Sequence, residues 1–504
     1  MKLPKYIVTL IATLLFVVLF FEKSLGLNVA IYGLSTLLLL AVFKREFFKS
    51  AVNSIVAAGF LLTSVFYFLY GSPFTLFVHF VSFALLLGLH TVVPIRNILY
   101  AIPSAVPNYF VALTDFFTSF RARKKKKRQL GLSRTFRIIF VPMFVLLLFV
   151  ALYSMGSTYF SDAVGSVTKV VEEVFLTIAK YIDIKAVFVG LVGLLFAVIH
   201  SLTSRNTLFS EKDAAQSDML SRVRSKVVRR FNNMDLSVEY KSGVFLFAGL
   251  SVLLSALLYL EVKNIWINFE WEGELLKQLV REGTYVLIAA ILISMAVTMY
   301  YFRKNLNFYR NNKAMKVLAY VWRGLNALLV VSVFVRNYYY ISYFGLAYKR
   351  IGVVFFLVLC LVGLYSLVLK IAKVKSTYYV TRVNALVANI TLVALCAFNW
   401  DVIIARYNFS HYKTAFVHLP FMSNLSDKAL PYLKLTDDQV KEIEGKQVEQ
   451  IPFARRGYFK DVGYQEKISE RIMDFNIEQQ SKHWLEMVWA ERKAYKRLLN
   501  EREK

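Results

Sequence analysis

Long apolar segments separated by short charged loops recur along this chain, and they constrain its fold more than any other feature. A helix of about 20 apolar residues crosses the roughly 30 Å hydrocarbon core of a bilayer, and only helices or closed barrels satisfy the backbone in lipid. We therefore predict an all-α fold, a polytopic transmembrane helical bundle of about 11 spans with a C-terminal extramembrane helical segment. The predicted spans are 5–22, 26–43, 52–70, 73–94, 135–155, 184–203, 242–260, 283–302, 316–335, 351–370 and 381–401.

Composition agrees with a membrane protein and argues against other classes. Hydrophobic residues make up 57% of the 504 residues, and the net charge is +28. Because Lys and Arg collect in the cytoplasmic loops of membrane proteins, we interpret this charge as a topology signal and predict no nucleic-acid partner. Cys360 and Cys396 both lie in apolar segments. We expect no disulfide framework, no metal site and no cofactor.

The distribution of basic residues predicts the orientation. With a cytoplasmic N-terminus, the loops that follow spans 2, 4, 6, 8 and 10 lie inside, and they are the basic ones. The outer loop 261–282, in contrast, carries five Glu against three basic residues. The loop 336–350 is the exception, because it is outer but carries Arg336, Lys349 and Arg350. An odd number of spans places the C-terminus outside, and a miscount of one span reverses that side.

Four regions follow from this pattern. Residues 1–96 hold spans 1 to 4, and residues 135–401 hold spans 5 to 11 with amphipathic outer loops. Residues 402–504 are polar and predict a C-terminal helical, extracytoplasmic segment, with a capping box at 436–439 and an apolar stripe along 465–503. Within 402–504 we find no nucleophile elbow, metalloprotease motif or glycine-rich phosphate loop, so no catalytic residue is predicted.

The remaining region, 97–134, combines an aromatic-rich interfacial segment with a polybasic cytoplasmic loop. Such a cluster attracts anionic lipid headgroups by about 1 kcal/mol per charge near the surface. An ordinary stop-transfer flank is the alternative. A second inner segment, 204–241, contains Asp213 and Asp218 and predicts a surface helix or a partner-binding segment. The candidate headgroup contacts in the polybasic loop are Arg121, Arg123, Lys124, Lys125, Lys126, Lys127 and Arg128.

Polar side chains inside predicted spans are a further class of candidate. A charge at membrane depth is costly and usually marks function. Arg323 lies in the ninth span, where it is close enough to the inner end to snorkel. His79 and His90 lie eleven residues apart on one face of the fourth span. A proton relay between them is one hypothesis, and ordinary buried histidines are the alternative.

Five short motifs lie close together in the second half of the chain. They are YVWRGLN at 320–326, VRNY at 335–338, GLAYKRIG at 345–352, NWDVIIARYN at 399–408 and LSDKALP at 425–431. Over about 316–440 the chain resembles a bacterial polytopic membrane family that is known as a domain of unknown function. The resemblance implies a bacterial inner-membrane protein with this C-terminal helical segment. It implies no reaction, substrate or catalytic residue.

Seven polar or aromatic residues near the outer ends of the last three predicted spans form a candidate outer polar cluster. Such a cluster binds an anionic headgroup, a carboxylate or another protein, or it locks the C-terminal segment onto the bundle. We favour the lock, and we expect an ion pair between Asp401 and Arg406. The candidate residues are Arg336, Tyr348, Lys349, Arg350, Asp401, Arg406 and Tyr407.

The function that these features favour is an integral membrane protein of the cell envelope, either a structural or assembly protein or a partner-binding subunit, without a catalytic site of its own. A transporter or lipid-handling permease is the first alternative, and a membrane-embedded enzyme acting on a lipid-linked substrate is the second. The expected partners are membrane lipids, with anionic headgroups at the cytoplasmic face, and a membrane or envelope protein.

Overall fold

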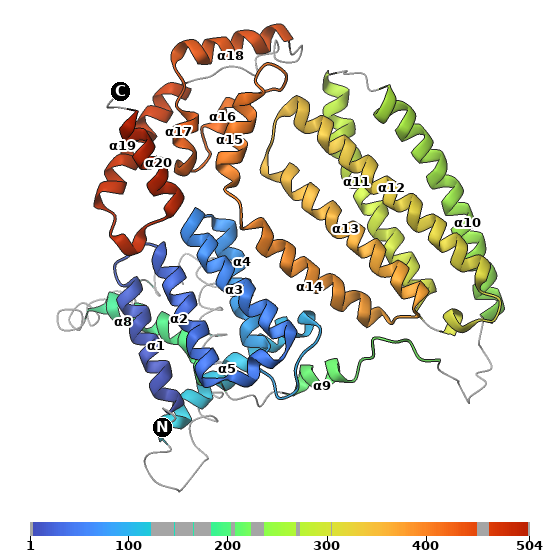
Figure 1. The fold of residues 1–504 in the computed structure, drawn as a ribbon, viewed down its shortest axis with the longest axis horizontal. Helices are drawn as coiled ribbons and strands as arrows, with labels where there is room; N and C mark the ends of the chain where they lie inside the picture. Colours follow the sequence, from blue (N-terminus) through green and yellow to red (C-terminus); the bar gives the residue numbers. More distant parts are fainter. Residues whose placement is uncertain are drawn as a thin grey trace.

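The computed structural model describes residues 4–121, 183–202, 207–222, 236–268, 273–303, 305–450 and 463–501, and the single residues 146 and 165. Regular structure in these residues is helical, and the only β-pairing among them is an isolated bridge between Met219 and Lys375. Figure 1 shows two groups of long helices, one helix between them, and a set of shorter helices over one end.

The first group, which we call the N-lobe, is built from apolar helices. Its core contains Leu40, Phe60, Leu86 and Ile199, none more than 2% exposed. The short helices η1 (Arg45–Lys49), η2 (Ile98–Tyr100) and η3 (Val198–His200) connect or extend the longer ones. The long helices are α1 (Lys5–Phe20), α2 (Leu27–Phe43), α3 (Ala51–Tyr70), α4 (Pro73–Gly88), α5 (Ala101–Arg121) and α8 (Ile184–Ala197).

The second group, the M-lobe, contains longer helices that pack around Phe247, Leu357 and Leu364. Its outer surface is apolar, and Phe245 is 83% exposed. In water such a surface would promote association, whereas in lipid it is the expected exterior. The long helices are α10 (Leu236–Glu261), α11 (Gly273–Tyr301), α12 (Lys313–Phe344) and α13 (Tyr348–Ala372), with η4 (Val262–Ile267) and η5 (Asn305–Phe308) in the connections.

Helix α14 (Thr377–Leu395) runs between the two lobes (Figure 1). Its first turn is capped by Ser376, whose Oγ accepts a hydrogen bond from the Tyr379 backbone N–H. Gly59 of α3 allows a close approach, because a Cβ at that position would lie 3.2 Å from the Val393 side chain. α14 therefore belongs to neither lobe alone.

The C-terminal helices form a separate core, which we call the cap. Ile404, Met422 and Leu430 are fully buried within it. The predicted capping box is present, since Thr436 N–H donates to Gln439 and Gln439 N–H donates to Thr436 Oγ1. The helices are α15 (Trp400–Ser410), α16 (Leu419–Met422), η6 (Asp427–Ala429), α17 (Leu430–Leu433), α18 (Asp437–Gln450), α19 (Tyr464–Ser481), η8 (Trp484–Glu486) and α20 (Trp489–Asn500).

The predicted spans correspond to apolar helices wherever the structure describes them. Among the described residues, six helices are long and apolar enough to cross a membrane, and four more are apolar but shorter. The fifth predicted span, 135–155, lies outside the described residues, so the total of eleven is not confirmed. Several boundaries are corrected. α4 ends at Gly88, short of the predicted 94, so His90 lies beyond the helix, and α12 continues past the predicted 335 to Phe344. α14 ends at Leu395, and Asp401 lies in the next helix, because Asn399 caps a new N-terminus there.

The inter-helix turns divide between two ends of the molecule. Three turns meet the cap at glycines: Gly26 lies against Glu486, Gly71 against Val488, and Gly345 against Asn408. Gly71 and Gly345 have positive φ values of 58° and 75°, which glycine adopts without strain. At the opposite end, α9 (Leu208–Ala214) passes beneath α14 (Figure 1).

Candidate functional site

The centre of the cap-side polar cluster is the carboxylate of Asp401. The Tyr348 hydroxyl donates a hydrogen bond to Oδ1, and Lys428 Nζ lies 2.9 Å from Oδ2. Lys428 Nζ also donates to the Tyr70 carbonyl oxygen at 2.7 Å. These three side chains, which we call the cap lock, thus join the start of α13, the start of α15 and η6 to the end of α3.

Local structure explains why these groups meet. The Asn399 side chain accepts a hydrogen bond from Val402 N–H, which starts α15 and leaves Asp401 in its first turn. Asn408 lies two turns further along α15 and binds the α12–α13 turn through both its amide atoms. Its Oδ1 accepts from Leu346 N–H at 2.6 Å, and its Nδ2 donates to Leu346 O at 3.0 Å. This double contact fixes the turn that precedes Tyr348.

The electrostatics of the lock favour the ionised carboxylate. Burial acts to raise the pKa of Asp401, but the Lys428 charge and the hydrogen bonds from Tyr348 and Lys428 outweigh it, so the pKa lies below its usual value. Asp401 and Lys428 are only 8% and 5% exposed. A buried, fully paired carboxylate of this kind is poorly placed to bind a ligand or to act as a general base.

The other predicted cluster residues lie around the lock with different partners. The Arg350 guanidinium stacks 3.4 Å over the Tyr340 ring, and the Arg350 backbone carbonyl oxygen accepts a hydrogen bond from Asn337 Nδ2. Lys349 is exposed.

The expected ion pair between Asp401 and Arg406 is wrong. Lys428 occupies the carboxylate instead, and Arg406 lies 5.8 Å over the Tyr432 ring. Tyr407 stacks on His411 with ring centroids 4.2 Å apart.

Arg336 is placed elsewhere by the structure. Its Nε donates to Glu261 Oε2 at 2.9 Å, and its Nη2 makes a second, short contact to Oε1. Ser332, one turn earlier on α12, also donates to Glu261. Arg336 and Ser332 share the face of α12 that packs on α10. Arg336 therefore forms a buried ion pair with Glu261 inside the M-lobe and is not part of the cap lock.

Arg323 does not snorkel. It is 2% exposed, and its Nη2 donates to the Ser294 carbonyl oxygen of α11 at 2.8 Å. Its Nε and Nη1 have no hydrogen-bond partner among the residues that the structure describes. The guanidinium also lies 4.5 Å over the Trp322 ring. This is a buried cation in the M-lobe without an acidic neighbour in salt-bridge range in the described parts of the chain.

The two histidines of the predicted fourth span have separate surroundings. His79 Nδ1 is 3.0 Å from Thr63 Oγ1, and its ring stacks on Phe60. His90 Nδ1 donates to the Leu86 carbonyl oxygen, and its ring stacks on Phe47. Each ring is thus held by a different helix or turn, and nothing in the described contacts links one to the other.

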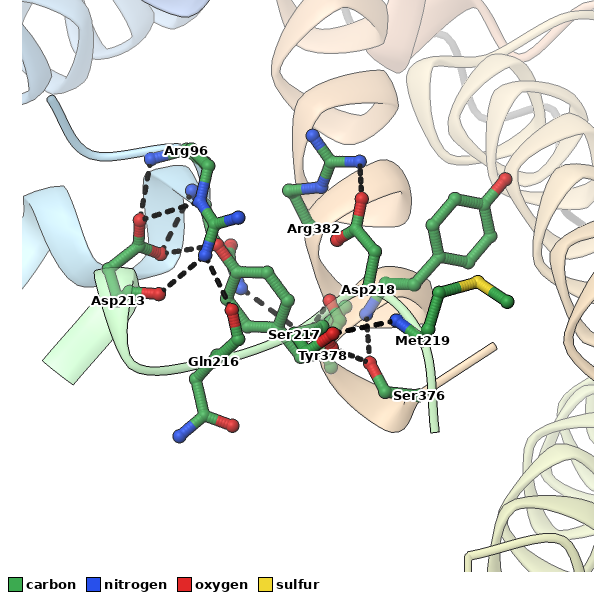
Figure 2. A network of polar contacts seen from close by, with 12 residues as sticks. Arg96, Asp213, Gln216, Ser217, Asp218, Met219, Ser376, Tyr378 and Arg382 are labelled. Carbon is green, nitrogen blue, oxygen red and sulfur yellow. Dashed lines mark hydrogen bonds and ion pairs between the residues drawn. The ribbon is translucent and has the colours of Figure 1, made fainter. Parts of the chain in front are cut away.

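A second polar network holds the opposite end of α14 (Figure 2). Asp213, at the end of α9, is fully buried and accepts hydrogen bonds from the backbone N–H groups of Arg96 and Asn97 and from the Tyr378 hydroxyl. The Arg96 guanidinium in turn donates to the carbonyl oxygens of Asp213 and Gln216. Asp213 therefore joins the segment before α5 to the first turn of α14.

A few residues further on, the same extended segment pairs with the α13–α14 turn. Arg382 Nη2 lies 2.6 Å from Asp218 Oδ2 (Figure 2). The Ser376 hydroxyl donates a hydrogen bond to the Ser217 carbonyl oxygen, and the Ser376 N–H donates to the Asp218 carbonyl oxygen. We call Arg96, Asp213, Asp218, Tyr378 and Arg382 the α14 clasp. The predicted surface helix over 204–241 is corrected here, because within 207–222 only Leu208–Ala214 is helical. Asp213 does not face solvent but is buried among groups of the same chain.

The chain matches the family described as Domain of unknown function (DUF4153) over residues 7–435, most of its 504 residues. The chain belongs to this family. The predicted resemblance to an uncharacterised membrane family is thus confirmed, and it extends well beyond 316–440. No curated protein and no solved structure matches the chain.

The DUF4153 match covers both lobes, α14, the cap lock and the α14 clasp, and it ends before α18. It assigns no chemistry to these residues. Among the described residues, no group of three or more His, Cys, Asp or Glu side chains is placed to hold a metal ion. Of the candidate headgroup contacts, Arg121 ends α5, and Arg123, Lys124 to Lys127 and Arg128 lie outside the described residues.

Sequence reasoning missed Lys428, Glu261 and the clasp. Lys428 was visible in the 425–431 motif, directly after Asp427, but nothing in the sequence indicates that it reaches Asp401 and α3. Asp213 and Asp218 stand out as acids in a basic segment. An acid in a basic inner loop is a signal that could have pointed to an internal partner.

Proposed function

We propose that this protein is a non-catalytic scaffold of the bacterial inner membrane, in which the two lobes hold the cap as a fixed platform for a membrane or envelope protein. The observation that carries the proposal is that the chain is held by polar contacts on both sides of α14, at its first turns and in the helix after it. The clasp binds its first turns through Tyr378 and Arg382, and the cap lock binds the helix that follows it through Asp401.

The use of the polar groups supports a scaffold over an enzyme or a carrier. Asp401, Asp213 and Glu261 are buried acids, and each is paired with basic or hydroxyl groups of other helices. Acidic groups that are paired in this way stabilise one arrangement of the helices. A carrier that alternates between two arrangements would need to break one of these sets in each cycle.

The charges of the turns support an N-terminus in the cytoplasm and a cap outside. The end of the molecule that holds the clasp carries the basic turns, as the positive-inside rule expects for a cytoplasmic face. The turns at Gly26 and Gly71, which meet the cap, lack this concentration of charge. The basic residues of the clasp end include Lys44, Arg45, Lys49, Arg303, Arg310, Lys313, Lys373 and Lys375.

Native mass spectrometry of the protein, purified from its own membranes in mild detergent, tests the scaffold. We expect a protein partner at fixed stoichiometry with the wild type. Asp401→Ala should release that partner, because the cap loosens. Glu46→Ala should retain it, because Glu46 is an exposed residue of η1 and its ion pair is a local one, with Lys49. Recovery of the wild type without any protein partner would contradict the proposal.

A second candidate function, the carriage of an anionic substrate or lipid, is favoured by Arg323. A buried cation without an acidic partner is costly at membrane depth. An anionic group beside Nε and Nη1, which have no hydrogen-bond partner among the described residues, would offset that cost. If this candidate holds, the wild type retains a small anion or anionic lipid, and Arg323→Gln loses it. Arg303→Gln is the control, because Arg303 pairs with Glu239 near the end of α11.

A further inference from the structure

The tip of the cap, residues 481–489 between α19 and α20, carries two exposed tryptophans. Trp484 is 62% exposed and Trp489 is 54% exposed. Large aromatic surfaces of this kind are seldom left in water, and in membrane proteins Trp collects at the level of the lipid headgroups.

Neighbouring residues fix the position of the tip against the N-lobe. Leu485 is buried in the cluster of Phe16, Leu19 and Tyr32, which belong to α1 and α2. Val488 packs on Gly71, at the turn between α3 and α4, with its methyl groups 3.1 Å from a Cβ placed there. The tip is therefore anchored by its inward residues, while the tryptophans on either side of them point away from the N-lobe core.

The depth of the tip follows from these anchors. Glu486 lies directly against Gly26, at the turn between α1 and α2. The tryptophans thus stand beside two turns that end apolar helices, which is the level at which a bilayer passes from hydrocarbon to headgroups. Exposed Leu25 and Phe74 lie beside the same turns. The tip is continuous with the lipid-facing surface of the N-lobe.

The basic residues of α20 also suit a position at the boundary between hydrocarbon and headgroups. Arg492, Lys493 and Lys496 are exposed within the first two turns of the helix, beyond Trp489. Tryptophan at the edge of the hydrocarbon with Lys and Arg a turn or two above it is the composition of an interfacial, membrane-lying surface. The basic side chains would then lie among lipid phosphates.

We propose that the cap tip is a lipid-contact surface, with Trp484 and Trp489 seated in the headgroup layer of the leaflet on the cap side. The lipid contact attaches the cap to the bilayer itself, in addition to its protein contacts with the membrane domain at the cap lock and at the tip. The ligand is the leaflet itself, with a preference for anionic phospholipids because of the charges on α20.

Site-directed spin labelling measures this directly. Labels are placed by Trp484→Cys and Trp489→Cys in a protein whose buried Cys360 and Cys396 are replaced by Ala, reconstituted in phosphatidylethanolamine and phosphatidylglycerol vesicles. Power saturation compares collisions with oxygen, which concentrates in lipid, and with a water-soluble nickel chelate. Labels at Phe77, 61% exposed on α4, and at exposed Asp438 on α18 give the lipid and water references.

We expect labels at 484 and 489 to show an oxygen-to-nickel ratio several-fold above that at 438. The ratio should fall along α19 from 477 to 473, because these exposed positions lie one and two turns further from the tip. A nickel accessibility equal to that at 438 would place the tip in water and overturn the proposal. Low accessibility to both reagents would also overturn it, because a protein surface would then cover the tip. The label at Phe77 shows independently that the membrane domain is inserted.

Discussion

The buried charged residues of this protein differ mainly in the groups that they contact. Asp401 pairs with Lys428 and Arg336 pairs with Glu261, whereas Arg323 contacts a carbonyl oxygen and the Trp322 ring and has no acidic partner among the residues that the structure describes. Removing one member of a buried pair leaves the other unpaired, which costs far more than the pair itself contributes. The role of each charge is thus set by its partner.

Asp401→Ala should destabilise the protein by about 3 kcal/mol, because Lys428 stays buried without its carboxylate. The measurement is thermal unfolding in detergent, together with limited proteolysis of the cap. Glu46→Ala should unfold with the wild type, since an exposed pair contributes little. Equal unfolding temperatures for Asp401→Ala and Glu46→Ala would show that the lock is not stabilising.

Acid should weaken the cap lock. The folded-state pKa of Asp401 is lowered, so the ionised carboxylate contributes stability that is complete above the ordinary Asp pKa of about 3.9 and is lost as the pH falls through the folded value. Unfolding temperatures between pH 6 and pH 3 should therefore fall more steeply for the wild type than for Asp401→Asn. Parallel curves for the two proteins would contradict this assignment.

At the scale of helices, close approaches at turns decide how the cap sits. Gly26, Gly71 and Gly345 each leave room for a cap residue. These contacts depend on the absence of a Cβ. Replacing one of the glycines by Ala, which adds one methyl group, therefore tests whether the contact holds the cap in place.

Gly26→Ala should displace the cap tip, because the new Cβ would lie 2.3 Å from the backbone carbonyl carbon of Glu486. We expect a lower unfolding temperature and faster proteolysis at 481–489. Gly445→Ala is the matched control with the opposite sign. No atom of the part of the chain that the structure describes lies within 4 Å of a Cβ at that position, and Ala in place of Gly within α18 should stabilise the helix by about 0.5–1 kcal/mol.

The two halves of the α14 clasp should respond unequally. Asp213 is fully buried and accepts from three groups, so Asp213→Ala should cost about 3 kcal/mol. The Asp218 and Arg382 side chains are each 29% exposed, so Asp218→Ala should cost about 1 kcal/mol or less. Hydrogen exchange at 377–383 and thermal unfolding measure both. A larger effect at Asp218 would reverse this assignment.

At the scale of the whole molecule, alternating turns place the clasp and the cap at opposite ends. We expect a C-terminal fusion to alkaline phosphatase, which is active only outside the cytoplasm, to be active. A green fluorescent protein inserted after Arg310, at the clasp end, should fluoresce, as it does in the cytoplasm. Loss of both signals would invert the topology, and a signal from only one of the two fusions would put Arg310 and the C-terminus on the same side and contradict the alternation.

How far the sequence predicted the molecule can be judged from particular elements. The apolar runs predicted the positions of α1 to α4, α8 and α10 to α14, since helix length follows from the bilayer thickness. The end of α14 was placed too late, because local capping by Asn399 and not hydropathy ends one helix and begins the next. The cluster around Tyr348 and Asp401 was found from motifs near helix ends, whereas the pairing of Asp401 with Arg406 was wrong.

By itself the sequence determined that the chain is helical, that it spans a membrane, and which family it belongs to, because hydropathy and short motifs are local properties of the chain. Only the tertiary structure decided the partners. Lys428 contacts Asp401, 27 residues away, and Tyr70, 358 residues away. Glu261 and Asp213 also contact groups that are distant in the sequence. Such contacts depend on how the helices pack, because a buried charge is costly without a partner and the partner is supplied by whichever helix lies against it.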